Sequence, residues 1–320
     1  MSFPARTLGN EGPAVSALGL GCMGMSDFYG PSDREAALAT IAEALDAGIT
    51  LLDTGDFYGM GHNEMLLAEA LRGKREKAFI QVKFGAQRSP DGRFLGIDAR
   101  PAAMKTALSY SLRRLQTDYI DLYMTGPDPA VPIEETVGAM GDMVRQGYVR
   151  HIGITNVDAD TIRRAHAAHP ITALQCEYSL MTRDIEADIL PVCRELGIGI
   201  TAYGVLSRGL LTGSSGNGEG DWRAVTMPRF RGDNLRHNTT LAQALAQVAA
   251  DEGMTAAQAA IAWVASQGQD IIPLVGARTV ARLHEALRAP LALSTEALAR
   301  IDSVVPEGTV RGGSHMSASD

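Results

Sequence analysis

Short apolar segments alternate along the chain with amphipathic segments that have helical spacing. Between Ser32 and Gly48 the hydrophobic residues recur at i, i+3, i+4 and i+7, which is the pattern of one buried helix face. Ser32 and Glu35 have the spacing of a capping box at the start of this helix, and Gly48 supplies a stop signal. The same alternation of an apolar run and a helical pattern recurs along the rest of the chain.

The apolar runs have the character of strands in a parallel sheet. They are continuous rather than alternating, as expected when both faces of a sheet are buried. Each run is followed by a helical pattern, which makes eight predicted βα units. Eight such units predict an α/β protein with a (β/α)8 TIM barrel, and residues 5–17 are expected to form a hairpin that closes the barrel bottom. The predicted strands are 18–23, 49–53, 78–83, 119–124, 148–155, 172–175, 198–203 and 271–276.

An open, doubly wound sheet is the alternative for the same alternation. Residues 19–24 have the glycine spacing of a dinucleotide-binding turn, but no helical pattern opens directly on them. The chain has no low-complexity linker, so we expect a single domain over residues 1–320. Residues 214–221 are expected to form a flexible loop, and the chain from about residue 308 a loose C-terminal tail.

Composition and charge narrow the class of protein. The formal net charge of −8 disfavours nucleic acid and anionic membranes as partners. No apolar run reaches the ~18 residues of a membrane span, and no secretory signal is recognisable. The three cysteines are isolated and match neither a metal-ligand spacing nor a disulfide framework. We therefore expect a cytoplasmic protein without a metal site.

Three residues near the ends of the second and third predicted strands form a candidate chemical unit. Asp53 ends one strand, Tyr58 follows in a glycine-flanked loop, and Lys83 ends the next strand. An ammonium beside a phenol favours the phenolate, and a carboxylate beside the ammonium holds it in place. Taken singly, each has an ordinary alternative: Asp53 as a cap, Tyr58 as a wall residue and Lys83 as a solvated charge. Because the carboxyl ends of barrel strands share one face, we expect the three to meet as a proton-transfer unit.

Several motifs in a fixed order give the chain a resemblance to a known family. They include LLDTGDFYG at 51–59 and GYVRHIGITNV at 147–157. On these motifs the chain resembles the aldo-keto reductases over nearly its whole length, in particular the bacterial branch related to potassium-channel β-subunits and pyridoxal-type reductases. The resemblance implies a barrel enzyme that reduces aldehydes or ketones to alcohols with NADPH. The matching segments are 18–30, 51–64, 82–85, 118–123, 147–157, 173–180, 202–213 and 275–287.

The family's catalytic residues are an Asp, a Tyr, a Lys and a His. The resemblance places Asp53, Tyr58 and Lys83 in the first three positions. Tyr58 would then donate a proton to the carbonyl oxygen of a small-molecule substrate while the nicotinamide delivers hydride to the carbon. Gly126 stands where the His is expected, and no neighbouring residue is a His. This difference implies weak turnover, a wider substrate pocket, or replacement of the His by another group such as His62.

The resemblance also implies a set of NADPH-binding residues. Asn156 and Gln175 would hold the nicotinamide carboxamide, because an amide side chain offers a donor and an acceptor together. Tyr203 would stack under the nicotinamide ring. Arg278 and Arg282 would flank the 2′-phosphate, which favours NADPH over NADH, although a solvated helix face is the alternative for this pair. The implied residues are Cys22, Met23, Thr155, Asn156, Gln175, Tyr203, Gly204, Leu206, Ser207, Arg208, Leu210, Gly276, Arg278, Arg282 and Glu285.

The substrate pocket is the least specified part of the sequence. Candidate pocket residues are Phe28, Tyr29, Met124 and Gly126, with Phe57, Trp222 and Phe230 as further walls. Two alternatives to a reductase remain: an NADPH-binding sensor or regulatory subunit with slow turnover, and a Schiff-base barrel enzyme that uses Lys83 as its nucleophile. The substrate, the physiological direction and the oligomeric state are left open by the sequence.

Overall fold

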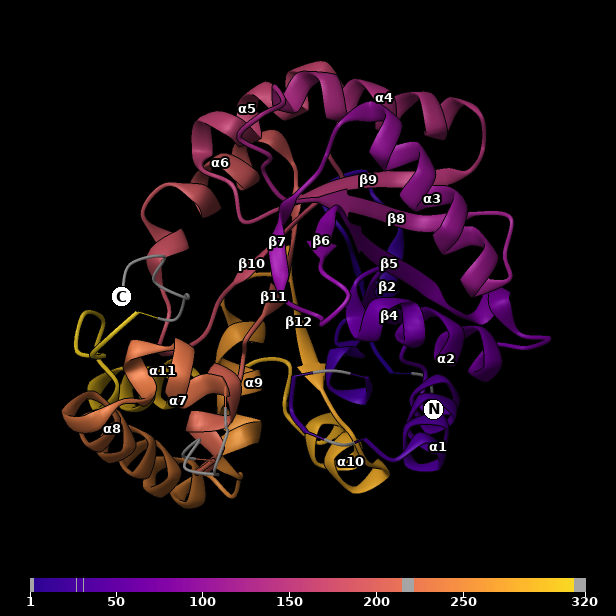
Figure 1. Cartoon of the computed structure of the whole chain (residues 1–320). Coiled ribbons are helices and arrows are strands. Elements are labelled where there is room, and N and C mark those ends of the chain that lie inside the picture. The colour runs from indigo at the N-terminus through magenta and orange to yellow at the C-terminus, as the bar shows by residue number, and fades with distance from the viewer. Residues whose placement is uncertain (1–2, 27, 31, 215–221, 314–320) are drawn as a thin grey trace. The chain divides into compact units, whose positions relative to one another are not determined.

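The structure is a computed structural model that describes residues 3–26, 28–30, 32–214 and 222–313 (Figure 1). The chain divides into two compact units. The barrel unit comprises residues 1–176, 185–201 and 270–283, and the second unit comprises residues 177–184, 202–269 and 284–320. The single domain expected over residues 1–320 stays a prediction.

The barrel unit is built on a closed barrel of parallel strands. The strands are β3 (Gly19–Gly21), β4 (Leu51–Gly55), β5 (Phe79–Phe84), β8 (Ile120–Thr125), β9 (Val149–Thr155), β10 (Ala173–Glu177), β11 (Gly199–Tyr203) and β12 (Ile271–Gly276). Within the described residues, the order around the barrel is β10-β11-β12-β3-β4-β5-β8-β9. Each strand coincides with one predicted from an apolar run, and the closed barrel confirms the (β/α)8 fold.

Six helices of the barrel unit follow strands along the chain, and α3 lies against β5 and α4 against β9 (Figure 1). The helices are α1 (Arg34–Asp46), α2 (His62–Ala70), α3 (Pro101–Leu115), α4 (Ile133–Arg145), α5 (Ala159–Ala168) and α6 (Ile189–Leu196). The capping box predicted from Ser32 and Glu35 is wrong, because α1 begins one residue later than that pattern requires. Asp33 is the N-cap and accepts a hydrogen bond from the Ala36 N–H, while the Ser32 hydroxyl donates to the Met25 carbonyl.

An N-terminal hairpin closes the barrel at the start of its strands. Strands β1 (Ala5–Thr7) and β2 (Ala14–Ser16) pair antiparallel. Arg6 Nη1 donates to the carbonyl oxygen of Ile271, the first residue of β12, over 2.6 Å. Ser16 Oγ accepts from the Thr50 N–H over 3.0 Å, directly before β4. The hairpin expected at the barrel bottom is therefore confirmed.

A second hairpin follows β5 and was not expected from the sequence. It consists of β6 (Ala86–Arg88) and β7 (Phe94–Ile97), which pair antiparallel with an irregularity between Gln87 and Arg88. Phe94 and Leu95 are both exposed. Because neither face of this hairpin is buried by the core, its residues lack the apolar pattern that marks a barrel strand.

The second unit is mainly helical. Its elements include the short helix η5 (Ser207–Thr212), α7 (Trp222–Thr226), α8 (Gly232–Asp251), α9 (Ala256–Ser266) and α11 (Thr295–Val304). Trp263 is fully buried, lies 5.4 Å from Tyr178 between ring centroids, and donates from Nε1 to Asp302 Oδ1 over 3.1 Å. Helix α10 (Val280–Leu287) begins in the barrel unit and ends in the second unit. The described part of the chain contains no helix whose length and apolarity suit a membrane span.

The start of the predicted C-terminal tail is hydrogen-bonded to α8. Asn238 Nδ2 donates to the Arg311 carbonyl over 2.8 Å, and the Arg311 N–H donates to Asn238 Oδ1 over 3.0 Å. His237 Nε2 lies 2.8 Å from the Thr309 carbonyl oxygen. The remainder of this tail, residues 314–320, and most of the predicted flexible loop, residues 215–221, lie outside the described residues.

Gly199 provides a test of how the N-terminal hairpin of β1 and β2 packs against the barrel. A Cβ at this position would lie 2.5 Å from the Gly9 nitrogen and 2.8 Å from Leu8 Cδ1. We expect Gly199→Ala to lower the free energy of unfolding by about 1–3 kcal/mol through overpacking. Gly138→Ala is the control, because nothing lies within 4 Å of its added Cβ in α4. The free energy of unfolding of the control should rise by about 0.5–1 kcal/mol, because Ala has a higher helix propensity than Gly. Urea unfolding measures both; equal stability of the two variants would contradict this packing.

Candidate active site

Asp53 and Lys83 form a buried ion pair inside the barrel. Strands β4 and β5 are neighbours, with Gly55 opposite Lys83 and Asp53 opposite Gln81. Lys83 Nζ donates to Asp53 Oδ1 over 2.6 Å, and both side chains are less than a tenth exposed. Two charges in such a place are stable only when they are paired and hydrogen-bonded. The ion pair therefore fixes the position of the ammonium group.

Asp53 Oδ1 receives two further hydrogen bonds from glutamine side chains. Gln81 Nε2 donates over 2.7 Å and Gln175 Nε2 over 2.8 Å. Gln175 comes from β10, so barrel closure brings it to β4. Gln81 was missed in the sequence, although it stands two residues before Lys83 and therefore on the same face of β5.

Tyr58 lies beside the ammonium of Lys83. Its ring centroid is 4.9 Å from Lys83 Nζ, and only 5% of the residue is exposed. Tyr58 begins the short helix η2 (Tyr58–Gly61), in which Gly59, Met60 and Gly61 all have positive φ. Left-handed backbone at a residue such as Met60 is strained and clusters at functional sites. The three residues predicted to meet are therefore brought together.

The loop that carries Tyr58 is closed by hydrogen bonds to Asn63. Thr54 Oγ1 donates to Asn63 Oδ1 over 2.7 Å, and Asn63 Nδ2 donates to the Cys22 carbonyl over 2.9 Å and to Ser26 Oγ over 2.7 Å. Asn63 is fully buried. It therefore joins β4, the chain after β3 and α2 to one another.

Cys22, Met23 and His62 lie around this network. The Cys22 thiol is buried, and burial raises its pKa well above the usual range. Met23 begins the short helix η1 (Met23–Met25) and is partly exposed. His62 is exposed, and its Nδ1 lies 2.8 Å from Ser26 Oγ. A catalytic role for His62 stays a prediction.

Gly126 lies directly after β8 and is buried. A Cβ at this position would find only Thr155 Cγ2 and the Thr155 carbonyl oxygen within 4 Å, both at 3.7 Å. These are ordinary van der Waals distances, and the backbone has no positive φ. The position therefore accepts the first atom of a larger side chain without strain.

The other pocket candidates have different surroundings. Met124 is fully buried, and its Cε would lie 2.6 Å from a Cβ at Gly153. Phe57 contacts the Tyr58 ring edge-on, with 4.8 Å between centroids. The Arg88 guanidinium lies 5.2 Å from the Phe28 ring centroid and 6.0 Å from that of Phe57.

Three pocket candidates remain to be placed. In the barrel unit, the Tyr29 carbonyl accepts from Arg278 Nη1 over 2.7 Å. In the second unit, Trp222 begins α7 and is partly exposed. Phe230 is only 2% exposed and lies against the Arg223 guanidinium, and its role as a pocket wall stays a prediction.

The cofactor candidates of the barrel unit lie at the ends of β9, β10 and β12. Asn156 has a φ of 53°, its N–H donates to the Gln175 carbonyl over 3.1 Å, and its Nδ2 donates to Thr155 Oγ1 over 3.0 Å. Its side chain is exposed. Gly276 ends β12, with only the Gly21 carbonyl near a Cβ, at 3.9 Å. Arg282 is exposed on the first turn of α10.

The cofactor candidates of the second unit centre on η5. Arg208 lies over the Tyr203 ring at 5.1 Å and places Nη2 3.8 Å from Glu177 Oε2. Ser207 and Arg208 have φ values of 48° and 56°, and Ser207 Oγ lies 3.0 Å from Ser179 Oγ. Two successive left-handed residues other than glycine are strained, and such strain clusters at functional sites.

Four candidates of the second unit have simpler surroundings. Gly204 has a φ of 69°, and Leu206 is the N-cap of η5. Leu210 is buried. The Glu285 carbonyl accepts a hydrogen bond from Gln258 Nε2 over 3.0 Å.

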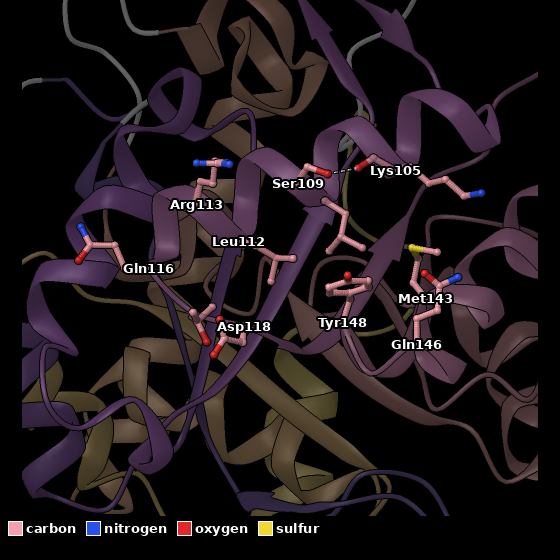
Figure 2. A pocket seen from close by; sticks show the side chains of 11 residues that line it. Lys105, Ser109, Leu112, Arg113, Gln116, Asp118, Met143, Gln146 and Tyr148 are labelled. Atoms are coloured by element: carbon pink, nitrogen blue, oxygen red, sulfur yellow. Dashed lines mark hydrogen bonds between the residues drawn. The ribbon is translucent and has the colours of Figure 1, made fainter.

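A groove of about 640 Å³ lies on the outer surface of the barrel unit between α3 and α4 (Figure 2). Lys105, Arg113 and Tyr148 are among its lining residues. Asp118 and Tyr148 precede β8 and β9, so the groove lies at the opposite end of these strands from Lys83. The described residues contain no cluster of His, Cys, Asp and Glu that suits a metal ion.

Comparison with known proteins identifies the family. A model of the aldo/keto reductase family matches residues 17–306. The chain is 41% identical over 321 residues to "Probable aldo-keto reductase 1" of Glycine max, which covers 98% of this chain and 92% of that protein. The structure of a glycerol dehydrogenase from Gluconobacter oxydans is similar with a TM-score of 0.86, 28% identity and coverage of 95% and 96% of the two chains. An aldo/keto reductase from Klebsiella pneumoniae, solved with NADP and acetate, is similar with a TM-score of 0.73, 28% identity and coverage of 94% and 95%. The chain belongs to the aldo/keto reductase family.

Proposed function

We propose that this protein uses NADPH to reduce an aldehyde or ketone to an alcohol, with Tyr58 as the proton donor. Membership of the family makes it an oxidoreductase that acts on carbonyl compounds. The observation that carries the finer proposal is the arrangement of Tyr58, Lys83 and Asp53 inside the barrel unit. Oxidation of the alcohol is the reverse of the same reaction.

The three side chains have separate roles in the proposed proton transfer. When bound, the nicotinamide supplies hydride to the carbonyl carbon. Tyr58 gives its hydroxyl proton to the carbonyl oxygen, and the phenolate left behind is stabilised by the ammonium of Lys83. Asp53 holds that ammonium at 2.6 Å from its own Oδ1. Lys83 is unsuited to Schiff-base chemistry in this arrangement, because its amine would first have to lose a proton and leave Asp53.

The chemistry of the candidate residues fits a phosphorylated dinucleotide. In the barrel unit, Asn156 presents an exposed amide that suits a carboxamide, and Arg278 and Arg282 provide guanidinium groups that suit a 2′-phosphate. In the second unit, the strained segment of Ser207 and Arg208 suits a pyrophosphate. The Klebsiella pneumoniae relative was solved in complex with NADP, which supports the same choice here.

A slow NADPH-binding sensor is the second candidate function. Gly126 favours it, because the position where the resemblance expects a His has no side chain to orient a substrate carbonyl. Under this alternative the cofactor residues keep their roles and turnover is slow. For either function we propose a cytoplasmic location, since three isolated cysteines are typical of a reducing compartment.

Tyr58→Phe tests the proton donor. We expect kcat for reduction of a panel of aldehydes and ketones to fall about 10²- to 10⁴-fold, because the phenolic proton is removed. NADPH affinity, measured by fluorescence titration, should stay unchanged. Tyr110→Phe is the control, since Tyr110 is an exposed residue of α3. Undiminished turnover by Tyr58→Phe would contradict the proposed function.

Arg278→Ala together with Arg282→Ala tests the choice of cofactor. The Kd for NADPH should rise at least about tenfold, because each charge-assisted hydrogen bond to a phosphate is worth about 1.5–3 kcal/mol. The Kd for NADH, which lacks the 2′-phosphate, should change little. Arg288→Ala controls for the loss of positive charge near α10. If NADPH affinity is unchanged in the double variant, the two arginines are only a solvated helix face.

Gly126→His tests whether the missing His limits activity. Its Cβ fits at 3.7 Å from Thr155, so the imidazole can enter without backbone strain. We expect kcat/KM for small aldehydes to rise about tenfold, at the low end of the effect of a positioned hydrogen-bonding catalyst. Gly126→Ala adds the Cβ without the imidazole and should show no gain. If kcat/KM of Gly126→His falls or does not change, the missing His does not explain slow turnover.

A further inference from the structure

Asp56 is partly buried and stands two residues before Tyr58 in the segment that follows β4. The Asp56 N–H donates to the Lys83 carbonyl over 2.9 Å, which joins this segment to β5. Asp56 Oδ1 is buried and has no hydrogen-bond partner among the described residues. Asp56 takes no part in the proposed proton transfer, so its burial here needs another explanation.

A second buried carboxyl group lies close to Asp56. Glu64 of α2 has a fully buried side chain, and Arg114 Nη1 of α3 donates to its Oε2 over 2.9 Å. Glu64 Oε1 and the Tyr123 hydroxyl of β8 are also buried without a hydrogen-bond partner in the described ranges. This set of Asp56, Glu64, Arg114 and Tyr123 is called the Asp56 cluster.

Arg114 holds both ends of the segment from Asp56 to Gly61. Its Nη1 lies 3.4 Å from the Asp56 carbonyl oxygen, within hydrogen-bond reach. At the other end, a Cβ at Gly61 would lie 2.7 Å from Arg114 Nε, so the guanidinium packs directly on this glycine. Tyr58 lies between the two contacts. Arg114 therefore contacts the backbone on either side of Tyr58.

The Asp56 cluster has two carboxyl groups and one guanidinium. An uncompensated charge in a buried place is costly, so two carboxyl groups with one guanidinium favour a proton on one of the carboxyl groups. Burial, followed by the negative charge of Glu64, raises the pKa of Asp56 to about 7. The N–H groups of Gly85 and Phe57 and the charge of Arg114 oppose this shift but do not cancel it. A protonated Asp56 also supplies an O–H donor to a cluster with unpartnered oxygens.

We infer that Asp56 holds a proton in the active form and, with Glu64 and Arg114, acts as a positioning residue for Tyr58 and Lys83. Loss of this proton places a second negative charge beside Glu64 and loosens the segment from Asp56 to Gly61. The groups that face Asp56 are Glu64 from α2, Arg114 from α3, Tyr123 from β8, and the N–H groups of Gly85 after β5 and of Phe57 in the same segment. The role in turnover rests on the proposed function, whereas the buried proton does not.

The sign of the stability effect follows from proton linkage. The folded protein keeps the Asp56 proton at a pH where the unfolded chain, with an ordinary pKa of 3.8, has lost it. The contribution of this group to the free energy of unfolding therefore falls as the pH rises from about 4 through about 7. Asn at this position cannot ionise and removes that fall.

The first experiment measures the proton without turnover. The Tm of Asp56→Asn, relative to the wild type, should be higher at pH 8.5 than at pH 5.5. Infrared difference spectra at pH 6 should show a protonated carboxyl band in the wild type that is absent from the variant. Asp118→Asn is the control, since Asp118 is exposed at the opposite end of β8. A Tm difference that does not change with pH, or a missing carboxyl band, would overturn the inference.

The second experiment measures positioning during NADPH oxidation with the best aldehyde of the panel. As Asp56 ionises, kcat of the wild type should fall about tenfold between pH 6 and 9, with KM for NADPH little changed. The fall should be less than about twofold in Asp56→Asn. Glu64→Gln should shift the fall to lower pH, because the charge that raises the pKa of Asp56 is removed. Identical pH profiles in all three proteins would overturn the positioning role.

The two proposals fail in different ways. If Tyr58→Phe keeps full turnover, the proposed function fails, while the Tm and infrared measurements still decide whether Asp56 holds a proton. If Asp56→Asn does not fold, Glu64→Gln still tests the cluster through the shift of the pH profile. Wild-type behaviour of Glu64→Gln at every pH would then overturn the inference.

Discussion

The ion pair between Lys83 and Asp53 is the interaction on which the site depends. Two charges inside a barrel lose their hydration, and their mutual attraction offsets this cost only when further hydrogen bonds complete the arrangement. Asp53 Oδ1 receives three donors, from Lys83, Gln81 and Gln175, and these come from two different strands. The set of donors to Asp53 is therefore complete only in the closed barrel, because Gln175 reaches Asp53 from β10. The hydrogen bonds to Asp53 therefore join strands of the barrel and also fix the ammonium of Lys83.

The barrel was predictable from the sequence because every one of its strands has a clear pattern of apolar residues. Continuous apolar runs mark strands buried on both faces, and all eight were placed correctly. Elements with weak burial had no such signal, which is why the hairpin of β6 and β7, with exposed Phe94 and Leu95, was not expected. The N-cap of α1 was misplaced from Asp33 to Ser32 because a four-residue pattern does not distinguish adjacent polar residues that can both cap.

In the candidate site, too, some residues could be predicted from the sequence and others could not. Asp53, Tyr58 and Lys83 were found from strand ends, and the structure brings them together. Gln81 has no motif, and its role arises from the register that sets it opposite Asp53. Asp56 and Arg114 are far apart in sequence, and only packing of α3 against the segment after β4 shows that they touch. The positive φ values of Asn156, Ser207 and Arg208 could not be predicted from the sequence either, because each residue type is common in ordinary loops.

The contacts between the N-terminal segment and β12 have a consequence for the synthesis of this protein. Arg6 bonds to Ile271 across 265 positions of the chain, and Tyr29 accepts from Arg278 across 249. Strand β3 likewise pairs with β12, so the first and last barrel strands meet at one seam. A ribosome delivers the amino-terminal side of this seam long before the other side. Until β12 emerges, the β3 edge has no strand to pair with on this side, and an unpaired strand edge is prone to aggregation.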